Sequence, residues 1–198
     1  MIHSPLGDFR SVFDGGFARF GRRSAVRNLL TFTEELDNAA WAKNRLSVSA
    51  NAGNDPNGAT TADKIIPNAT SSAYHYIGRS SLGLASASVI SIHAKADGYD
   101  FFEITANNGA AAAPDRAIFD LSGGSVSESA GDVTGQIVDL GGGWYRCVAL
   151  MSAALSAFYM HSRPDGNTTS FTGDGSSGAL AWGAQLELAG AVTGYQKV

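Results

Sequence analysis

Cysteine is almost missing from this chain, because Cys147 is its only copy among 198 residues. A single cysteine forms no intrachain disulfide, and a cysteine-based zinc site cannot be assembled from one chain. A lone cysteine in an apolar run behaves as a small hydrophobic side chain. We therefore expect Cys147 to lie in the core.

Long apolar runs and an excess of positive charge are missing too. No run reaches the length of a membrane span, and the start, MIHSPLGDFRSVF, lacks the basic residues and continuous apolar block of a secretory signal. The net charge of −4 opposes generic nucleic-acid binding, which needs a clustered basic surface. The sequence predicts no membrane span, no nucleic-acid partner and synthesis in a cytosol.

Sequence motifs of catalysis and cofactor binding are scarce. No G-x-S-x-G nucleophile turn occurs, and no local H-x-x-x-H pair exists among the four histidines, which are His3, His75, His93 and His161. Gly173, Gly175 and Gly178 match the dinucleotide fingerprint G-x-G-x-x-G, but a strand-like run follows them where the fingerprint needs a helix. We predict a non-enzymatic protein without a cofactor, in which these glycines form a turn.

Glycine and apolar residues are what the chain has in quantity. Its 24 glycines, 44% hydrophobic and 16% charged residues favour short strands and tight turns, and its length suits one principal domain. No regular crossover helices separate the strand candidates, which opposes a parallel sheet. We predict an all-β fold, an antiparallel β-sandwich, with strands near residues 45–50, 62–66, 73–79, 86–96, 99–106, 116–121, 136–140, 144–151, 157–162 and from 179 onward.

The run SFTGDGSSGALAWGAQLE, residues 170–187, is expected to close the sandwich. Period-two alternation predicts a half-buried strand with one face formed by Leu180, Trp182, Ala184 and Leu186, and the other by Ala181, Gly183, Gln185 and Glu187. Nearer the N-terminus, Thr33 before two glutamates indicates a helix cap and a brief helical turn that carries Trp41. Apolar surroundings predict core positions for Trp41, Trp144 and Trp182.

Residues 1–27 differ from the rest in composition. They carry five arginines against two aspartates, with Phe9, Phe13, Phe17 and Phe20 at helical spacing. Gly15, Gly16 and Gly21, which lie among these phenylalanines, oppose an isolated helix. We expect an extended arm whose phenylalanines cover either another surface or the chain's own sandwich.

Aromatic and polar residues suggest a sugar-binding function. Sugars stack their C–H faces on aromatic rings, and their hydroxyls bond to polar side chains. Tyr74 and Tyr76 share one face of a predicted strand, while His75 points the other way. Tyr99 and Asp100, with Glu103 nearby, form a second cluster. Candidate glycan contacts are Tyr74, Tyr76, Tyr99 and Asp100, although core roles for the tyrosines remain an alternative.

Three stretches together resemble a known family. They are RNLLTFTEELDNAAW with its downstream NDPNGATTADKI, then GGGWYRC, then SFTGDGSSGALAWGAQLE, and FDLSGG and HAKADG accompany them. They are similar to the carbohydrate-binding-module-like jelly-roll domains of bacteriophage tail and other virion proteins, over roughly residues 28–196. Such domains often end in Tyr-Ile-Pro-Thr, whereas this chain ends in GYQKV. The shared motifs are scaffold motifs, so no ligand residue is carried over.

The resemblance implies a jelly-roll module at residues 28–198, like galactose-binding and carbohydrate-binding modules, preceded by an attachment arm at 1–27. It implies a non-enzymatic virion protein, a tail fibre or head decoration, that is made in the host cytoplasm, forms a homo-oligomer and adheres to host polysaccharide. The alternatives are a polysaccharide-binding module without an assembly role and a polysaccharide-degrading enzyme. By analogy a structural calcium ion is allowed, with Glu187 among its ligands, and the metal content is left open. Contacts to other virion proteins are expected from Phe9, Arg10, Phe13, Phe17, Arg19, Phe20, Arg22 and Arg23.

Overall fold

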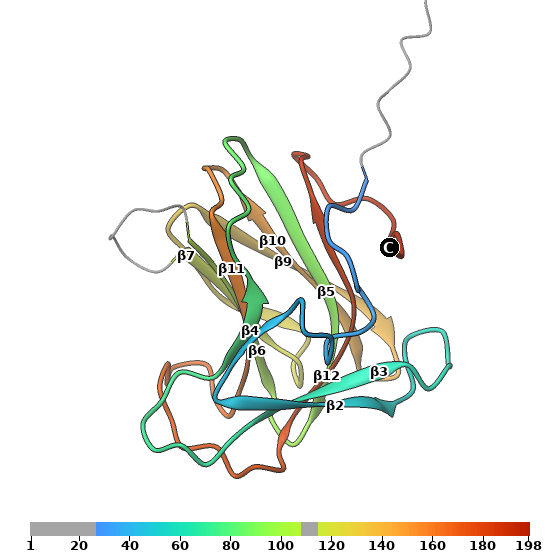
Figure 1. Ribbon diagram of the computed structural model, residues 1–198, viewed down its shortest axis with the longest axis vertical. Coiled ribbons are helices and arrows are strands. Elements are labelled where there is room, and N and C mark those ends of the chain that lie inside the picture. Colours follow the sequence, from blue (N-terminus) through green and yellow to red (C-terminus); the bar gives the residue numbers. More distant parts are fainter. Residues whose placement is uncertain (1–26, 108–114) are drawn as a thin grey trace, which may run out of the picture.

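A computed structural model (Figure 1) describes residues 27–107 and 115–198. The predicted all-β class is confirmed, because this part of the chain contains strands and turns and no α-helix. The strands are β1 (Ala42–Asn44), β2 (Leu46–Gly53), β3 (Ala62–Pro67), β4 (Tyr76–Arg79), β5 (Ser88–Asp97), β6 (Phe101–Asn107), β7 (Asp115–Asp120), β8 (Ser125–Ala130), β9 (Val133–Gly141), β10 (Trp144–Met151), β11 (Ala157–Arg163) and β12 (Gly178–Glu187). The arm residues Phe9 to Arg23 lie outside the described residues.

The strands form two six-stranded antiparallel sheets, which confirms the predicted sandwich. One sheet, called the front sheet here, has the order β1-β4-β11-β6-β7-β8, and the back sheet has the order β2-β3-β12-β5-β10-β9. Successive strand residues point to opposite faces, so each sheet turns one face towards the other and one outward. The main core cluster lies between the sheets and includes Ile77, Ile92, Phe102 and Phe158.

Residues predicted to be core are buried. Trp41 is 2% exposed and meets Phe158 edge-on with ring centroids 6.2 Å apart. The Arg79 guanidinium lies over the Trp41 ring, 4.6 Å from its centroid. Trp144 and Trp182 are buried as well, in a smaller cluster separate from the main core. Cys147 is fully buried, and burial strongly raises the pKa of its thiol, which suits an inert apolar role.

The predicted helical turn before β1 is wrong. Residues 31–41 form consecutive turns, with backbone bonds from Glu35 N to Phe32 O, Asn38 N to Glu35 O and Trp41 N to Asn38 O. Such three-residue steps do not continue into an α-helix, whose bonds span four residues. Thr33 is not a cap, because its hydroxyl contacts the Tyr195 hydroxyl at 2.8 Å and donates to the Val198 carbonyl.

Strands β1 and β8 were not predicted from the sequence. Strand β1 pairs with β4 and has three residues, AKN. Three residues are too few to show an alternation of apolar and polar side chains. Strand β8 reads SVSESA, is a polar edge strand and has no fully buried residue. Their strand geometry comes from pairing with β4 and β7, which is a tertiary contribution that overrides local propensity.

The closing strand β12 differs from its predicted pattern in two ways. All ten of its residues are buried, so the strand is not half-exposed. Gly183 has φ +64 and forms an irregularity at which the pairing with β5 shifts register. Leu180 and Trp182 therefore face outward into the smaller cluster, while Ala184 and Leu186 face the main core. A bulge inserts one residue and reverses the alternation beyond it, which a strict period of two cannot show.

The C-terminal segment covers the outer face of the back sheet and runs beside residues 27–34 (Figure 1). Gln185 accepts a hydrogen bond from the Gln196 backbone at 2.7 Å, and Glu187 accepts from the Thr193 backbone at 3.1 Å and from its hydroxyl. Tyr195 lies against Trp182 with ring centroids 4.7 Å apart. This cover explains why polar Gln185 and Glu187 are completely buried.

Candidate functional site

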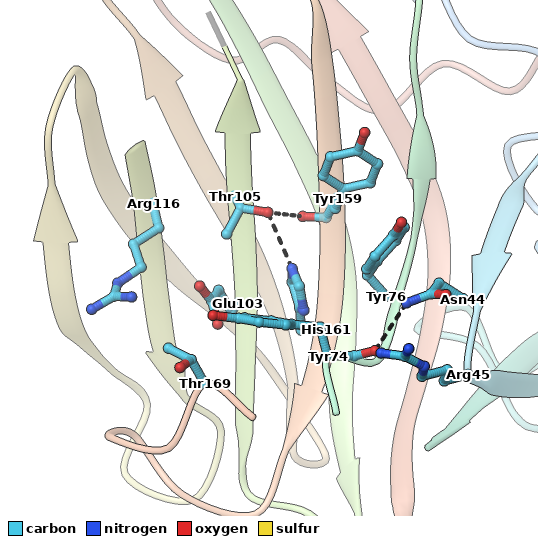
Figure 2. Close-up of a pocket in the computed structure, with 10 residues that line it drawn as sticks. All are labelled: Asn44, Arg45, Tyr74, Tyr76, Glu103, Thr105, Arg116, Tyr159, His161 and Thr169. Carbon is cyan, nitrogen blue, oxygen red and sulfur yellow. Dashed lines mark hydrogen bonds between the residues drawn. The ribbon is translucent and has the colours of Figure 1, made fainter. Parts of the chain in front are cut away.

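A cavity of about 520 Å³ opens on the outer face of the front sheet (Figure 2). We call it the tyrosine cavity. The residues that line it come from β1, β4, β11, β6 and β7 and from the adjoining loops, and they are Asn44, Arg45, Tyr74, Tyr76, Glu103, Thr105, Arg116, Tyr159, His161 and Thr169. Its volume lies in the range of small-molecule sites, roughly 300–1,000 Å³.

The alternation of side chains along β6 and β11 places the residues that form the floor of the cavity. Phe102 and Ile104 of β6 are buried in the core between the sheets. The residues that alternate with them on β6, Glu103 and Thr105, therefore point outward. The same reasoning applies to β11, where Tyr159 pairs with Thr105 and His161 with Glu103 across the ladder. Figure 2 shows these side chains side by side on neighbouring strands.

Three tyrosines form the aromatic part of the lining. Tyr76 and Tyr159 lie on adjacent strands with ring centroids 4.6 Å apart, and Tyr74 is 54% exposed beside them. Within the described residues, none of their hydroxyls has a hydrogen-bond partner. Gly78 is required opposite Tyr159, because a Cβ there would lie 2.7 Å from the tyrosine ring and 2.1 Å from the Phe158 carbonyl oxygen. The wall thus offers ring faces together with free hydroxyls.

Two ion pairs organise the polar side of the cavity. Glu103 and Arg163 form a buried pair at 2.5 Å, with side-chain exposures of 4% and 1%. Burial raises the pKa of Glu103, and the Arg163 charge acts against that rise. Arg116 binds Glu128 of β8 through two hydrogen bonds, from Nε at 3.0 Å and from Nη2 at 3.1 Å. Both carboxylates are therefore occupied by guanidinium groups.

Histidines near the cavity are held in place by protein groups. Nε2 of His161 lies 3.1 Å from the Thr105 hydroxyl. Burial, followed by the Arg163 charge, lowers the pKa of His161 to about 3, so the ring is neutral near pH 7. His75 is buried behind the lining, with its two ring nitrogens 2.5 Å from the Arg45 carbonyl oxygen and 3.0 Å from that of Phe171. It ties the β1–β2 turn to the loop between β11 and β12.

The structure brings together two of the four predicted glycan contacts. Tyr74 and Tyr76 line the cavity, and neither Tyr99 nor Asp100 does. Tyr99 is buried and meets Phe171 edge-on at 5.7 Å, so it lacks the exposed ring face that sugar stacking needs. Asp100 is exposed and immediately precedes β6. A glycan contact at any of the four stays a prediction.

The sequence reasoning missed several lining residues. Tyr159 and His161 alternate with buried residues in the strand predicted at 157–162, so the period of two was a usable signal for them. Asn44 had no such signal, because β1 was not recognised. Arg45 was the first residue of the strand predicted at 45–50, but it lies in the turn between β1 and β2. Arg116 and Thr169 reach the cavity through sheet order and a long loop, which no local pattern reveals.

The lining does not match the usual catalytic or metal constellations. Among the described residues that line the cavity, Glu103 is the only carboxylate, whereas glycoside hydrolysis ordinarily needs two. Elsewhere in residues 27–107 and 115–198, no three His, Cys, Asp or Glu side chains gather as a metal site would require. The structural calcium therefore stays a prediction, and both oxygens of Glu187 already accept hydrogen bonds from Thr193. The same residues contain no helix long and apolar enough to cross a membrane.

The chain shows a structural likeness to a known protein. No protein-family model matches the chain, and no curated protein matches it. Among solved structures, it is similar to the CBM22-1 and GH10 modules of endo-1,4-β-D-xylanase 10B from Clostridium thermocellum, solved with xylohexaose. The identity is 14% and the TM-score 0.43, over 87% of this chain and 29% of that chain. The fold assignment accordingly rests on the strands and sheets described above.

Proposed function

We propose that this chain binds polysaccharide in the tyrosine cavity and carries out no covalent chemistry there. The observation that carries the proposal is the lining itself, in which Tyr74, Tyr76 and Tyr159 present ring faces and unbonded hydroxyls beside polar groups. Sugars need this combination of apolar stacking and hydrogen bonding. The described lining residues include one carboxylate, Glu103, which is held by Arg163, and this favours binding over hydrolysis.

Titration calorimetry with a panel of soluble bacterial and plant polysaccharides tests the proposal. Tyr74→Ala removes an exposed ring and should weaken binding about fivefold to tenfold, since one aromatic contact contributes about 1 kcal/mol. Phe32→Ala is the matched control, because Phe32 is 41% exposed and does not line the cavity. Failure of every polysaccharide to bind at millimolar concentration would remove the proposal.

We further propose that residues 1–27 anchor the module to a virion and that the assembled protein is a homo-oligomer. Support comes from the sequence, namely the arginine-rich and phenylalanine-rich composition of this stretch and the resemblance to virion jelly-roll domains. A chain lacking residues 1–27 should fold and bind polysaccharide but fail to enter particles. Normal incorporation of the truncated chain would contradict the anchoring role, and a tail-fibre or head-decoration position would follow from its neighbours in the particle.

The same polysaccharides and particles distinguish the proposed function from two alternatives. A polysaccharide-binding module without an assembly role would bind the glycan and never copurify with particles. A polysaccharide-degrading enzyme would release reducing ends. The release would disappear in Glu103→Gln, which removes the only carboxylate among the described residues that line the cavity. We expect no release.

A further inference from the structure

We propose that the polysaccharide bound in the tyrosine cavity is acidic, and that Arg45 binds the anionic group of one of its sugar residues. This inference rests on the proposed function and deepens it. The relevant chemistry is a carboxylate or sulfate on the sugar, because a guanidinium group binds the oxygens of either with paired hydrogen bonds.

The charges around the cavity do not balance. Arg116 is neutralised by Glu128, and the floor carboxylate Glu103 is neutralised by Arg163. Arg45 is exposed and has no ion pair or side-chain hydrogen bond within the described part of the chain. One unpaired positive charge therefore remains at the rim of a cavity in a chain whose net charge is −4. A local field of this sign attracts an anionic ligand.

His161 adds no positive charge to that of Arg45 near neutral pH, because its pKa is low. Its value of about 3 means that the imidazole adds no positive charge to the cavity above roughly pH 4. His75 faces two backbone carbonyl oxygens and lies behind the lining. Arg45 is thus the charged group of the lining that is free to meet a ligand.

The backbone of Arg45 is held in an unusual and fixed conformation. Its φ is +54°, in the left-handed region where a non-glycine residue is disfavoured. Its carbonyl oxygen is bonded by the His75 ring at 2.5 Å and by the Asn68 backbone at 3.0 Å, which keeps the turn in place. Glycine or asparagine would satisfy this backbone more easily. The fixed backbone therefore holds the start of the Arg45 side chain at the cavity rim.

Neighbouring groups complete a subsite around this guanidinium. Asn44 donates from Nδ2 to the Tyr74 carbonyl at 3.0 Å, which ties the Arg45 turn to the segment that carries the exposed Tyr74 ring. Figure 2 shows Asn44, Arg45 and Tyr74 gathered on one side of the cavity and Arg116 on the other. A sugar stacked on Tyr74 can therefore present an acidic substituent to Arg45.

Matched glycan pairs test the inference. Each pair consists of an acidic oligosaccharide and its neutral form, namely a uronic-acid oligomer with its carboxyl-reduced form and a sulfated oligomer with its desulfated form. We expect at least one acidic member to bind about tenfold more tightly than its neutral partner at low salt. Raising NaCl to 0.5 M should reduce this preference, because the Arg45 contact is solvent-exposed.

Two variants assign the preference to Arg45. Arg45→Gln should bring the acidic oligosaccharide to within about twofold of its neutral partner, each measured with the variant. Lys95→Gln removes the same charge from the back sheet, where Lys95 donates to the Gly142 carbonyl at 2.7 Å, and should leave the preference unchanged. Circular dichroism confirms that both variants fold.

The outcomes separate this inference from the proposed function. Equal binding of every acidic and neutral pair would overturn the acidic specificity while leaving polysaccharide binding standing. A preference that survives Arg45→Gln would overturn the role of Arg45. Absence of binding to every member of the panel would overturn both proposals.

Discussion

Replacing Arg163 with methionine should destabilise the protein by about 3–5 kcal/mol at pH 7, because it leaves Glu103 buried without its counter-charge. The two side chains are 1% and 4% exposed and form a 2.5 Å ion pair, so solvent cannot substitute for the lost partner. Methionine replaces the aliphatic part of the arginine side chain, which limits the loss of packing. Removing one member of a buried pair is costlier than removing both.

The pH dependence of the free energy of unfolding gives an independent estimate of the destabilisation that Arg163→Met causes. Burial raises the pKa of Glu103 above its ordinary 4.5, and in the native protein Arg163 opposes that rise. A carboxyl group with a raised pKa in the folded state binds protons more tightly folded than unfolded, so its ionisation removes stability as pH increases above 4.5. Without Arg163 the slope approaches about 1.4 kcal/mol per pH unit, or about 3.5 kcal/mol between pH 4.5 and 7.

Urea unfolding followed by tryptophan fluorescence at pH 4.5 and pH 7 measures the effect. Arg163→Met should be close to the native protein at pH 4.5 and far less stable at pH 7. In the double variant Glu103→Leu with Arg163→Met, most of the loss at pH 7 should be recovered, since the buried charge is gone. A loss below about 1 kcal/mol at pH 7, or an equal loss at both pH values, would refute the reasoning.

Two further predictions concern the back sheet and acid stability. Gly183→Ala should lower stability by about 1–3 kcal/mol in the same urea assay, because φ is +64° and the new Cβ would lie 2.9 Å from His93 Nδ1; Gly190→Ala, with open space around its Cβ position, is the control. Burial lowers the pKa of His93 to about 4 and of His161 to about 3, below the ordinary 6.5. As the pH falls below 6.5, the unfolded chain therefore binds protons at these histidines before the folded chain does. Each histidine should lower the free energy of unfolding by up to about 1.4 kcal/mol per pH unit, until the pH reaches the pKa of that histidine in the folded state. NMR titration showing either imidazole protonated at pH 6 in the folded protein would contradict this.

The strand pattern was predictable where a strand is long and has a buried neighbour on each side. Strands β5, β10 and β12 read as apolar runs because they are central in their sheet. Strands β1 and β8 are edges, and their residues AKN and SVSESA carry little apolar signal. Local propensity is weak at such edges, so pairing decides the geometry there.

The candidate site was predictable only in part. Tyr74 and Tyr76 stood out as aromatic residues two apart on one predicted strand face, and both line the cavity. Tyr99 carried an equally good local signal, yet it packs on Phe171. The difference between an exposed and a covered tyrosine depends on the loop between β11 and β12, which is far away in sequence.

The sequence by itself determined the class of the fold, the burial of the tryptophans and of Cys147, and the turn at Gly175, whose φ is +74°. These features depend on period, size and backbone freedom, which are local properties of the chain. Only the tertiary structure decided which face of β12 meets the core, because the bulge at Gly183 reverses the alternation. It also decided that Arg45 has no counter-charge within residues 27–107 and 115–198, while Arg116 and Arg163 acquire theirs, since ion pairs form between strands that sequence order does not place side by side.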